Sequence, residues 1–113
     1  MNVKDTITFE EFKKIEIRMG KVIKAEKVEN ADKLLKLQVD FAGEIGVRQI
    51  VSGIAEYYST EELEGKKLPF IVNLEPRKFK GEESQGMLMA VDTEGKPVLL
   101  LPAEDVLEGS EVV

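Results

Sequence analysis

Hydrophobic and polar residues alternate through the middle of the chain with a period of two, the pattern of a strand that is buried on one face. The clearest alternating segment covers residues 35–41, and a second covers residues 45–51. The turn residues Ala42-Gly43-Glu44 separate the two segments. The pattern therefore predicts two neighbouring strands joined by a tight turn.

Three further segments complete a predicted set of five strands. The first strand is expected from about residue 15 to residue 28, and Gly20 inside it indicates a bulge or a tight bend. The fourth covers residues 68–72 and contains a proline, which is typical of an edge or a strand start. The fifth covers residues 87–91, and a hairpin turn at Thr93-Glu94-Gly95-Lys96 follows it.

Two segments, Thr8–Glu11 and Ser59–Glu62, have the pattern of a helix-capping box. Each predicts a short helix, and we expect Phe9 and Phe12 to lie on the buried side of the first. The predicted order is three strands, a short helix and two strands, with a bend in the first strand. This order is typical of an all-β, five-stranded OB-fold barrel. A small SH3-like barrel is the main alternative, and the helix after the third strand favours the OB fold.

The length of 113 residues corresponds to one domain. We expect residues 1–91 to form the barrel with its N-terminal helix, and residues 92–113 to form a C-terminal extension of the same domain. The extension contains an unbroken apolar run, residues 98–101, and then an acidic tail bounded by proline. A five-stranded barrel does not need these segments, so we predict that they pair in a two-fold homodimer.

The chain contains neither cysteine nor histidine. Their absence removes disulfides, the usual zinc ligands, the usual nucleophile–base pairs and the commonest general base. We therefore expect no catalytic site, no metal site and no cofactor. No apolar run approaches the ~20 residues of a membrane span, and the N-terminus lacks the layout of a signal peptide. We expect a cytoplasmic protein without a membrane partner.

The net charge is −6, but the charges are distributed unevenly. Residues 92–113 hold six acidic residues and one basic residue, whereas residues 66–80 hold five basic residues and one acidic residue. Arg77, Lys78 and Lys80 cluster around a single phenylalanine, an arrangement that suits contact with phosphates. Because stacking aromatic residues are few, the cluster favours a folded nucleic acid recognised by backbone and shape. The alternative is that the cluster is an ordinary solvated surface loop without a binding function.

Five short motifs follow one another along the chain. They are Glu16-Ile17-Arg18-Met19-Gly20-Lys21-Val22, Asn30-Ala31-Asp32-Lys33-Leu34, Arg48-Gln49-Ile50-Val51-Ser52-Gly53-Ile54, Asn73-Leu74-Glu75-Pro76-Arg77 and Ser84-Gln85-Gly86-Met87. Together they resemble the motifs of the tRNA-binding domains that are appended to methionyl-tRNA synthetases. The same fold and motifs also occur in an export-related chaperone that binds peptides and in a domain of the phenylalanyl-tRNA synthetase β-chain.

The resemblance implies an OB fold with a C-terminal extension, a homodimer formed largely through that extension, and binding to the outer corner of L-shaped tRNA. The catalytic part of methionyl-tRNA synthetase becomes a candidate partner. The predicted function is a non-catalytic tRNA-binding module, and the peptide-binding chaperone is the alternative. The expected tRNA-binding residues, taken from the motifs and from the basic cluster, are Lys33, Asn73, Arg77, Lys78, Lys80, Ser84 and Met87.

We expect the centre of the site on the loop between the fourth and fifth strands, with Lys33 in the first inter-strand loop. Arg77 is the strongest single candidate, because its planar guanidinium can hold a phosphate at two points. The alternative for Arg77 is a surface ion pair with Glu82 or Glu83. Two further roles are expected in this loop: Asn73 would order its backbone, and the Ser84 hydroxyl would be presented to a phosphate or ribose.

Overall fold

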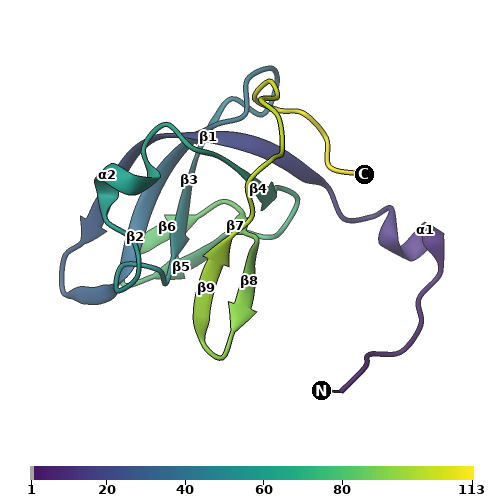
Figure 1. Cartoon of the computed structure of the whole chain (residues 1–113), viewed down its shortest axis with the longest axis horizontal. Helices are drawn as coiled ribbons and strands as arrows, with labels where there is room; N and C mark the ends of the chain where they lie inside the picture. Colours follow the sequence, from purple (N-terminus) through teal and green to yellow (C-terminus); the bar gives the residue numbers. More distant parts are fainter. Residues whose placement is uncertain (1) are drawn as a thin grey trace.

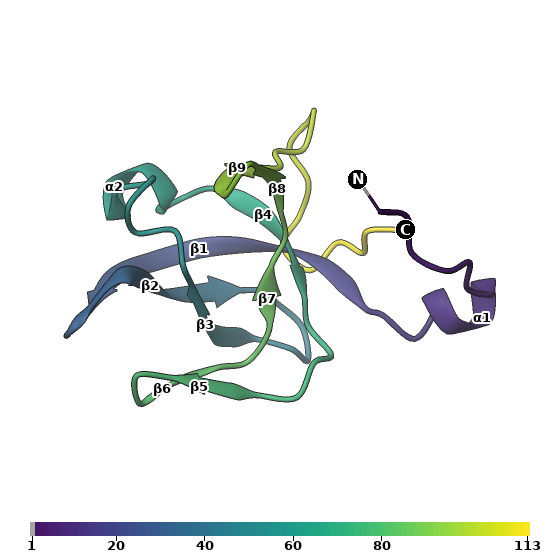
Figure 2. The same cartoon turned by 90° about the horizontal axis from the view of Figure 1, so that it is seen from below.

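The centre of the protein is one antiparallel sheet that coils around the core (Figures 1 and 2). A computed structural model describes residues 2–113 of the chain. Residues 21–28 of the first strand pair with the second strand, and residues 17–21 pair with the fourth. The strand order is β3-β2-β1-β4-β7, formed by β1 (Ile17–Val28), β2 (Ala31–Asp40), β3 (Val47–Ser52), β4 (Lys67–Ile71) and β7 (Met87–Leu88).

Gly20 is required because the backbone of β1 passes very close to core side chains. A Cβ atom at this position would lie 2.4 Å from Cγ1 of Val39 and 2.6 Å from Cε1 of Phe41. The pairing of β1 with β4 is regular at Gly20, so the predicted bulge does not lie there, and glycine is needed for this close approach. The pairing of β1 with β2 is irregular further along, between Val22 and Lys24 and again between Lys27 and Val28. An extra residue between Val22 and Lys24 increases the local bend and twist.

The core lies inside the coiled sheet, and α2 (Thr60–Leu63) contributes the fully buried side chain of Leu63 to it. The rings of Phe41 and Phe70 meet edge to face, with 5.5 Å between their centroids. Aromatic pairs prefer this arrangement. Burying a side chain of this size stabilises a fold by about 1.5–3 kcal/mol. The core therefore fixes the sheet whose ends carry the candidate site.

The outer strands β3 and β7 are joined by individual hydrogen bonds that the residues before β7 supply. The backbone N–H of Gln85 donates to the carbonyl of Gln49 at 2.8 Å, and the Gln49 N–H donates to Oε1 of Gln85 at 3.0 Å. The Val51 N–H donates to Oγ of Ser84 at 2.9 Å. These bonds bring the two edges of the sheet together around the core. The predicted all-β fold, with a helix between the third and fourth of five strands, is confirmed.

Both predicted capping boxes are present, but the first helix is not buried. In α1 (Phe9–Phe12) none of the four residues is buried, and Phe9 and Phe12 are 70% and 43% exposed. The prediction of a buried side was wrong, because residues 13–16 carry the helix away from the sheet (Figure 1). Among the described residues, no helix has the length and apolar character that crossing a membrane requires.

The predicted fifth strand is divided in two. It begins as β7, and after Met89 the separate strand β8 (Ala90–Thr93) pairs with β9 (Lys96–Leu99). The turn between these strands is confirmed, since Glu94 and Gly95 both have positive φ angles, 54° and 91°. A two-residue hairpin turn of the favoured type requires this conformation. The β8–β9 hairpin projects from the main sheet (Figure 1).

The C-terminal tail binds the stretch of β1 that β2 does not reach. Met19 exchanges backbone hydrogen bonds of 2.8 and 2.7 Å with residues 109–110. Lys67 holds the acidic part of the tail through Asp105 at 2.8 Å and Glu108 at 3.3 Å. The hydrogen bond between Lys67 and Asp105 lowers the pKa of Asp105 and raises the pKa of Lys67. The end of the extension is thus attached to the sheet of its own chain.

Candidate nucleic-acid interface

The segment between β4 and β7 forms a hairpin that the sequence analysis did not predict. It consists of β5 (Arg77–Phe79) and β6 (Glu82–Ser84). Its turn residues Lys80 and Gly81 have φ angles of 52° and 83°, as in the two-residue turn that suits the twist of paired strands. Figure 2 shows this hairpin on the opposite side of the sheet from the C-terminal tail.

The pairing inside the hairpin decides which of its side chains face the barrel. Residues directly opposite each other on antiparallel strands lie on the same face. Phe79 is opposite Glu82, and both are half-buried, whereas Lys78 is opposite Glu83, and both are exposed. The hairpin therefore has an inner face that packs toward β2 and β3 and an outer face that meets solvent.

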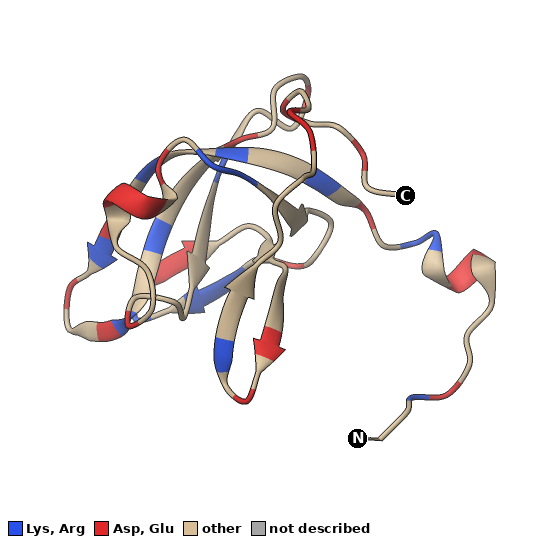
Figure 3. Ribbon diagram, viewed as in Figure 1, with Lys and Arg blue, Asp and Glu red and all other residues tan. Residues whose placement is uncertain are grey.

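A groove of about 630 Å³ separates this hairpin from the start of β2. Lys33 from β2 and Lys78 and Lys80 from the hairpin line it, beside the ring of Phe79 and the exposed Asp32. All three lysines are exposed, and within residues 2–113 none of them forms an ion pair. Three exposed lysines along one groove are suited to neutralising phosphates. Figure 3 shows the basic segments on β1, β2 and β5.

Lys33 lies on a strand and not in the loop where the sequence analysis expected it. The turn before β2 consists of Glu29 and Asn30, and Asn30 takes the positive φ of 62°. The strand begins at Ala31. The Lys33 carbonyl accepts a hydrogen bond of 3.1 Å from the Ala55 N–H, which holds its backbone more firmly than that of a free loop residue.

Arg77 stacks on the aromatic ring of its own strand. The centre of its guanidinium lies 4.8 Å from the centroid of the Phe79 ring, within cation–π distance. No acidic side chain of the described residues is within ion-pair distance of Arg77, and Glu82 pairs with Lys36 instead. The expected alternative, an ion pair with Glu82 or Glu83, is therefore not formed. The guanidinium is exposed, and no residue from 2 to 113 accepts a hydrogen bond from it, so its donors can meet a ligand.

Ser84 is a structural residue of the barrel in this arrangement. It is only 3% exposed, and its hydroxyl accepts from the Val51 N–H and donates to the Gly86 carbonyl, both at 2.9 Å. The only proton of the hydroxyl is thus already used, and the expected presentation of Ser84 to a phosphate finds no geometric support. Met87 is exposed and lines a small hollow of about 60 Å³ together with Arg77.

Asn73 orders the chain, as expected, through both ends of its amide. Its Oδ1 accepts from the Glu16 N–H at 2.8 Å, and its Nδ2 donates to the Lys14 carbonyl. The side chain therefore fastens the end of β4 to the segment before β1.

A polar network under the hairpin was missed by the sequence analysis. Gln49 on β3 accepts from Nε2 of Gln38 at 3.0 Å and donates to the Glu83 carbonyl at 2.9 Å. Glu82 completes the network with Lys36 at 3.4 Å. The available signal was the alternation of polar residues on the outward face of residues 35–41, which gave no indication of what would cover that face.

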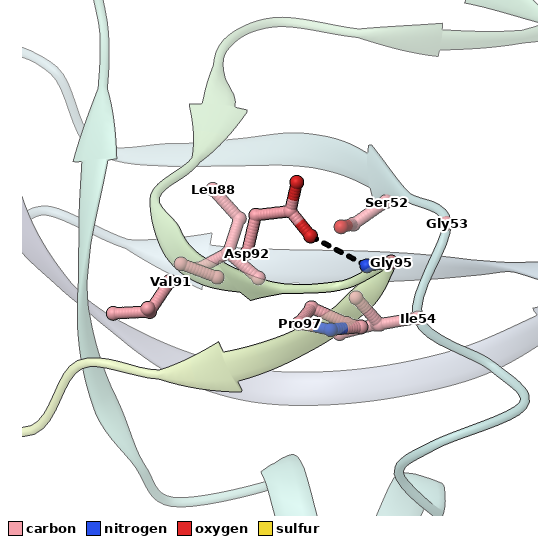
Figure 4. Close-up of a pocket in the computed structure, with 9 residues that line it drawn as sticks. Ser52, Gly53, Ile54, Leu88, Val91, Asp92, Gly95 and Pro97 are labelled. Atoms are coloured by element: carbon pink, nitrogen blue, oxygen red, sulfur yellow. Dashed lines mark hydrogen bonds between the residues drawn. The ribbon is translucent and has the colours of Figure 1, made fainter. Parts of the chain in front are cut away.

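A second hollow, of about 410 Å³, lies between the end of β3 and the β8–β9 hairpin (Figure 4). Asp92 there accepts a hydrogen bond of 2.7 Å from the Gly95 N–H, which stabilises the hairpin turn. None of the predicted site residues lines this hollow. Within residues 2–113, no group of three or more acidic side chains is placed to hold a metal ion.

Comparison with known proteins adds the observation that decides the family. The model of the family described as "Putative tRNA binding domain" matches residues 17–111. The chain belongs to this family. Its methionine–tRNA ligase relatives include that of Archaeoglobus fulgidus, 51% identical over 112 residues, which are 99% of this chain and 17% of the relative. The chain thus spans about a sixth of the length of the curated relatives that it matches.

Two solved structures support the same assignment. A MetRS-related protein from Pyrococcus horikoshii has a TM-score of 0.90 and 48% sequence identity, covering 97% of this chain and all of that protein. The chaperone CsaA from Bacillus anthracis has a TM-score of 0.86 and 29% identity, covering 96% of this chain. The expected resemblance to the tRNA-binding domains of methionyl-tRNA synthetases is confirmed, and the mostly β fold matches the structures of such domains.

Proposed function

We propose that this chain is a non-catalytic module that binds folded tRNA and assists methionyl-tRNA synthesis. The groove between β2 and the β5–β6 hairpin is the proposed site. Lys33, Lys78 and Lys80 contact phosphates there, and Arg77 extends the surface over the ring of Phe79. The family match and the methionine–tRNA ligase relatives support tRNA as the ligand and the synthetase as the partner.

The observation that carries the proposal is the convergence of cations from two distant segments on one groove. Lys33 is more than forty residues from Lys78 along the sequence, and the two line the same surface without acidic partners among the described residues. A single basic loop would be ordinary surface. A groove that gathers free cations from separate strands, in a chain of net charge −6, favours a specific anionic ligand.

The proposal extends to the outer corner of the tRNA, to a cytoplasmic location and to a homodimer. In support of dimerisation, the C-terminal extension exposes several large apolar side chains, among them Leu101 at 62% and Leu107 at 78%. Exposed large apolar side chains are common where a protein contacts a partner. Two copies would present two basic grooves to one tRNA and raise its affinity through effective concentration.

Binding to total tRNA, measured against a single-stranded RNA and an unfolded peptide, tests the proposed function. A patch that neutralises ~4–6 phosphates gives a slope of roughly −3 to −5 when log affinity is plotted against log salt concentration. We expect tRNA to bind most tightly of the three and with this slope. A salt-insensitive affinity, or equal affinity for single-stranded RNA, contradicts the proposal.

Peptide binding is the second candidate function, and the similarity to the CsaA chaperone structure favours it. The exposed rings of Phe9 and Phe12 on α1 offer apolar surface for such a role. The groove itself argues for tRNA, because its lysines would contribute little to binding an apolar peptide. Preferential binding of the unfolded peptide in the same experiment would establish the chaperone and refute the tRNA proposal.

A further inference from the structure

Two adjacent glutamates in the β5–β6 hairpin have opposite surroundings. Glu83 points to solvent opposite Lys78, and within residues 2–113 its carboxylate has no hydrogen-bond or ion-pair partner. Glu82 points inward, and both of its carboxylate oxygens are engaged. One oxygen lies 3.4 Å from the Lys36 ammonium, and the other accepts from Nε2 of Gln49, also at 3.4 Å.

The contacts of Glu82 join the hairpin to the sheet at the end nearest the groove. Lys36 belongs to β2, the strand that also carries Lys33, and Gln49 belongs to β3. Glu82 itself lies directly after the turn that carries Lys80. An isolated two-stranded hairpin is marginally stable in water, so the position of these three-residue strands depends on such contacts.

We propose that Glu82 is a positioning residue, which holds the β5–β6 hairpin against β2 and β3 so that its cations face Lys33 across the groove. The proposal rests on the proposed function, since it concerns the same tRNA site. The positioning role predicts an effect on tRNA affinity that the change in net charge alone does not predict. Removing the negative charge of Glu82 weakens tRNA binding, although the same removal at Glu83 strengthens it.

The two effects have different physical origins. A unit charge about 10 Å from a phosphate changes the interaction in water by only ~0.4 kcal/mol, so removing Glu83 raises affinity about twofold. Loss of the partly buried Glu82 contacts frees the hairpin, and ordering it again on binding opposes tRNA association. We expect about fivefold weaker binding, which corresponds to one lost charged hydrogen bond of about 1 kcal/mol at a partly exposed site.

The test compares Glu82→Gln, Glu83→Gln and Glu44→Gln, three substitutions with the same change in net charge. Glu44 is exposed in the turn at the opposite end of β2 and serves as the control. Affinity for total tRNA should fall about fivefold for Glu82→Gln, rise about twofold for Glu83→Gln and stay near the parent value for Glu44→Gln. If Glu82→Gln binds as tightly as Glu83→Gln, the positioning role is refuted.

A charge exchange separates positioning from simple structural damage. Glu82→Lys alone places two ammonium groups together, whereas Glu82→Lys with Lys36→Glu restores an ion pair. We expect the double variant to recover the tRNA affinity that the single variant loses. Tighter tRNA binding by the single variant than by the double would mean that only the local charge matters, and the proposal would fail.

Amide hydrogen exchange of the hairpin, measured without tRNA, separates this proposal from the proposed function. In the parent, the paired amides of β5 and β6 should be protected, and in Glu82→Gln their exchange should be about five times faster. The core amides of β1 and β2 should be unchanged. Unchanged exchange in the hairpin refutes the positioning role whatever the ligand, whereas faster exchange in a protein that does not bind tRNA supports it and refutes the proposed function.

Discussion

Replacing Ser84 tests how much its side-chain hydrogen bonds stabilise the fold, including the one that joins the β5–β6 hairpin to β3. Its buried hydroxyl satisfies the Val51 N–H and donates to the Gly86 carbonyl. Ser84→Ala leaves the N–H of Val51, a 7%-exposed residue, without a partner, and an unsatisfied buried donor costs ~1–3 kcal/mol. The substitution also removes the hydrogen bond that Ser84 donates to the carbonyl of the half-buried Gly86. Together, the two losses should lower the free energy of unfolding by about 2–3 kcal/mol.

Urea denaturation followed by circular dichroism measures this change. With an m-value of about 1–3 kcal/mol per molar for a domain of this size, the midpoint should fall by roughly 1 M or more. Ser52→Ala is the matched control, because the half-buried Ser52 hydroxyl makes no hydrogen bond with any of the described residues. Surface changes of this kind stay within about ±0.5 kcal/mol. Equal midpoints for the two variants would refute the structural role of Ser84.

Two further predictions concern β1 and the tail bound to it. Gly20→Ala places a methyl group against Val39 and Phe41, and we expect it to lower the free energy of unfolding by at least ~2 kcal/mol. The control Gly53→Ala should be nearly neutral in the same urea denaturation experiment, because the nearest atom to the added methyl group lies 4.0 Å away. Equal losses for the two variants would contradict the close approach at Gly20. In the folded protein the pKa values of Asp105 and Glu108 lie below their ordinary values of 3.8 and 4.5. The contribution of these carboxylates to tail binding is therefore complete above the ordinary pKa values, and it is lost as the pH falls through the lowered pKa values of the folded state. The protection factor of the Gly109 amide should therefore decrease only below about pH 4, and a protection factor that stays unchanged down to about pH 2 would contradict the contribution of these carboxylates.

Much of the fold could be predicted because it depends on local patterns. Alternation over residues 35–41, two capping boxes and the Thr93–Lys96 turn all have short-range physical causes, and each is present in the structure. The burial of α1 was predicted incorrectly for the opposite reason. Spacing shows which residues share a face of a helix, but whether that face meets a core depends on the path of residues 13–16.

The basic cluster was predictable from composition, whereas its arrangement depends on tertiary contacts. The Lys80-Gly81 pair was a usable signal for a hairpin turn, but three-residue strands of mostly charged residues show no hydrophobic alternation. The role of Ser84 could not be foreseen, because its partner Val51 is 33 residues away. The same applies to Glu82, whose partners lie on two other strands.

The affinity of Arg77→Glu for total tRNA tests the central claim most directly. Lys96→Glu, at the exposed start of β9, makes the same change in net charge away from the groove and is the control. Loss of a charged hydrogen bond of ~1–2 kcal/mol, with added repulsion, predicts at least about tenfold weaker binding for Arg77→Glu and about twofold for the control. If a folded Arg77→Glu variant binds tRNA as tightly as Lys96→Glu, this surface is not the tRNA site.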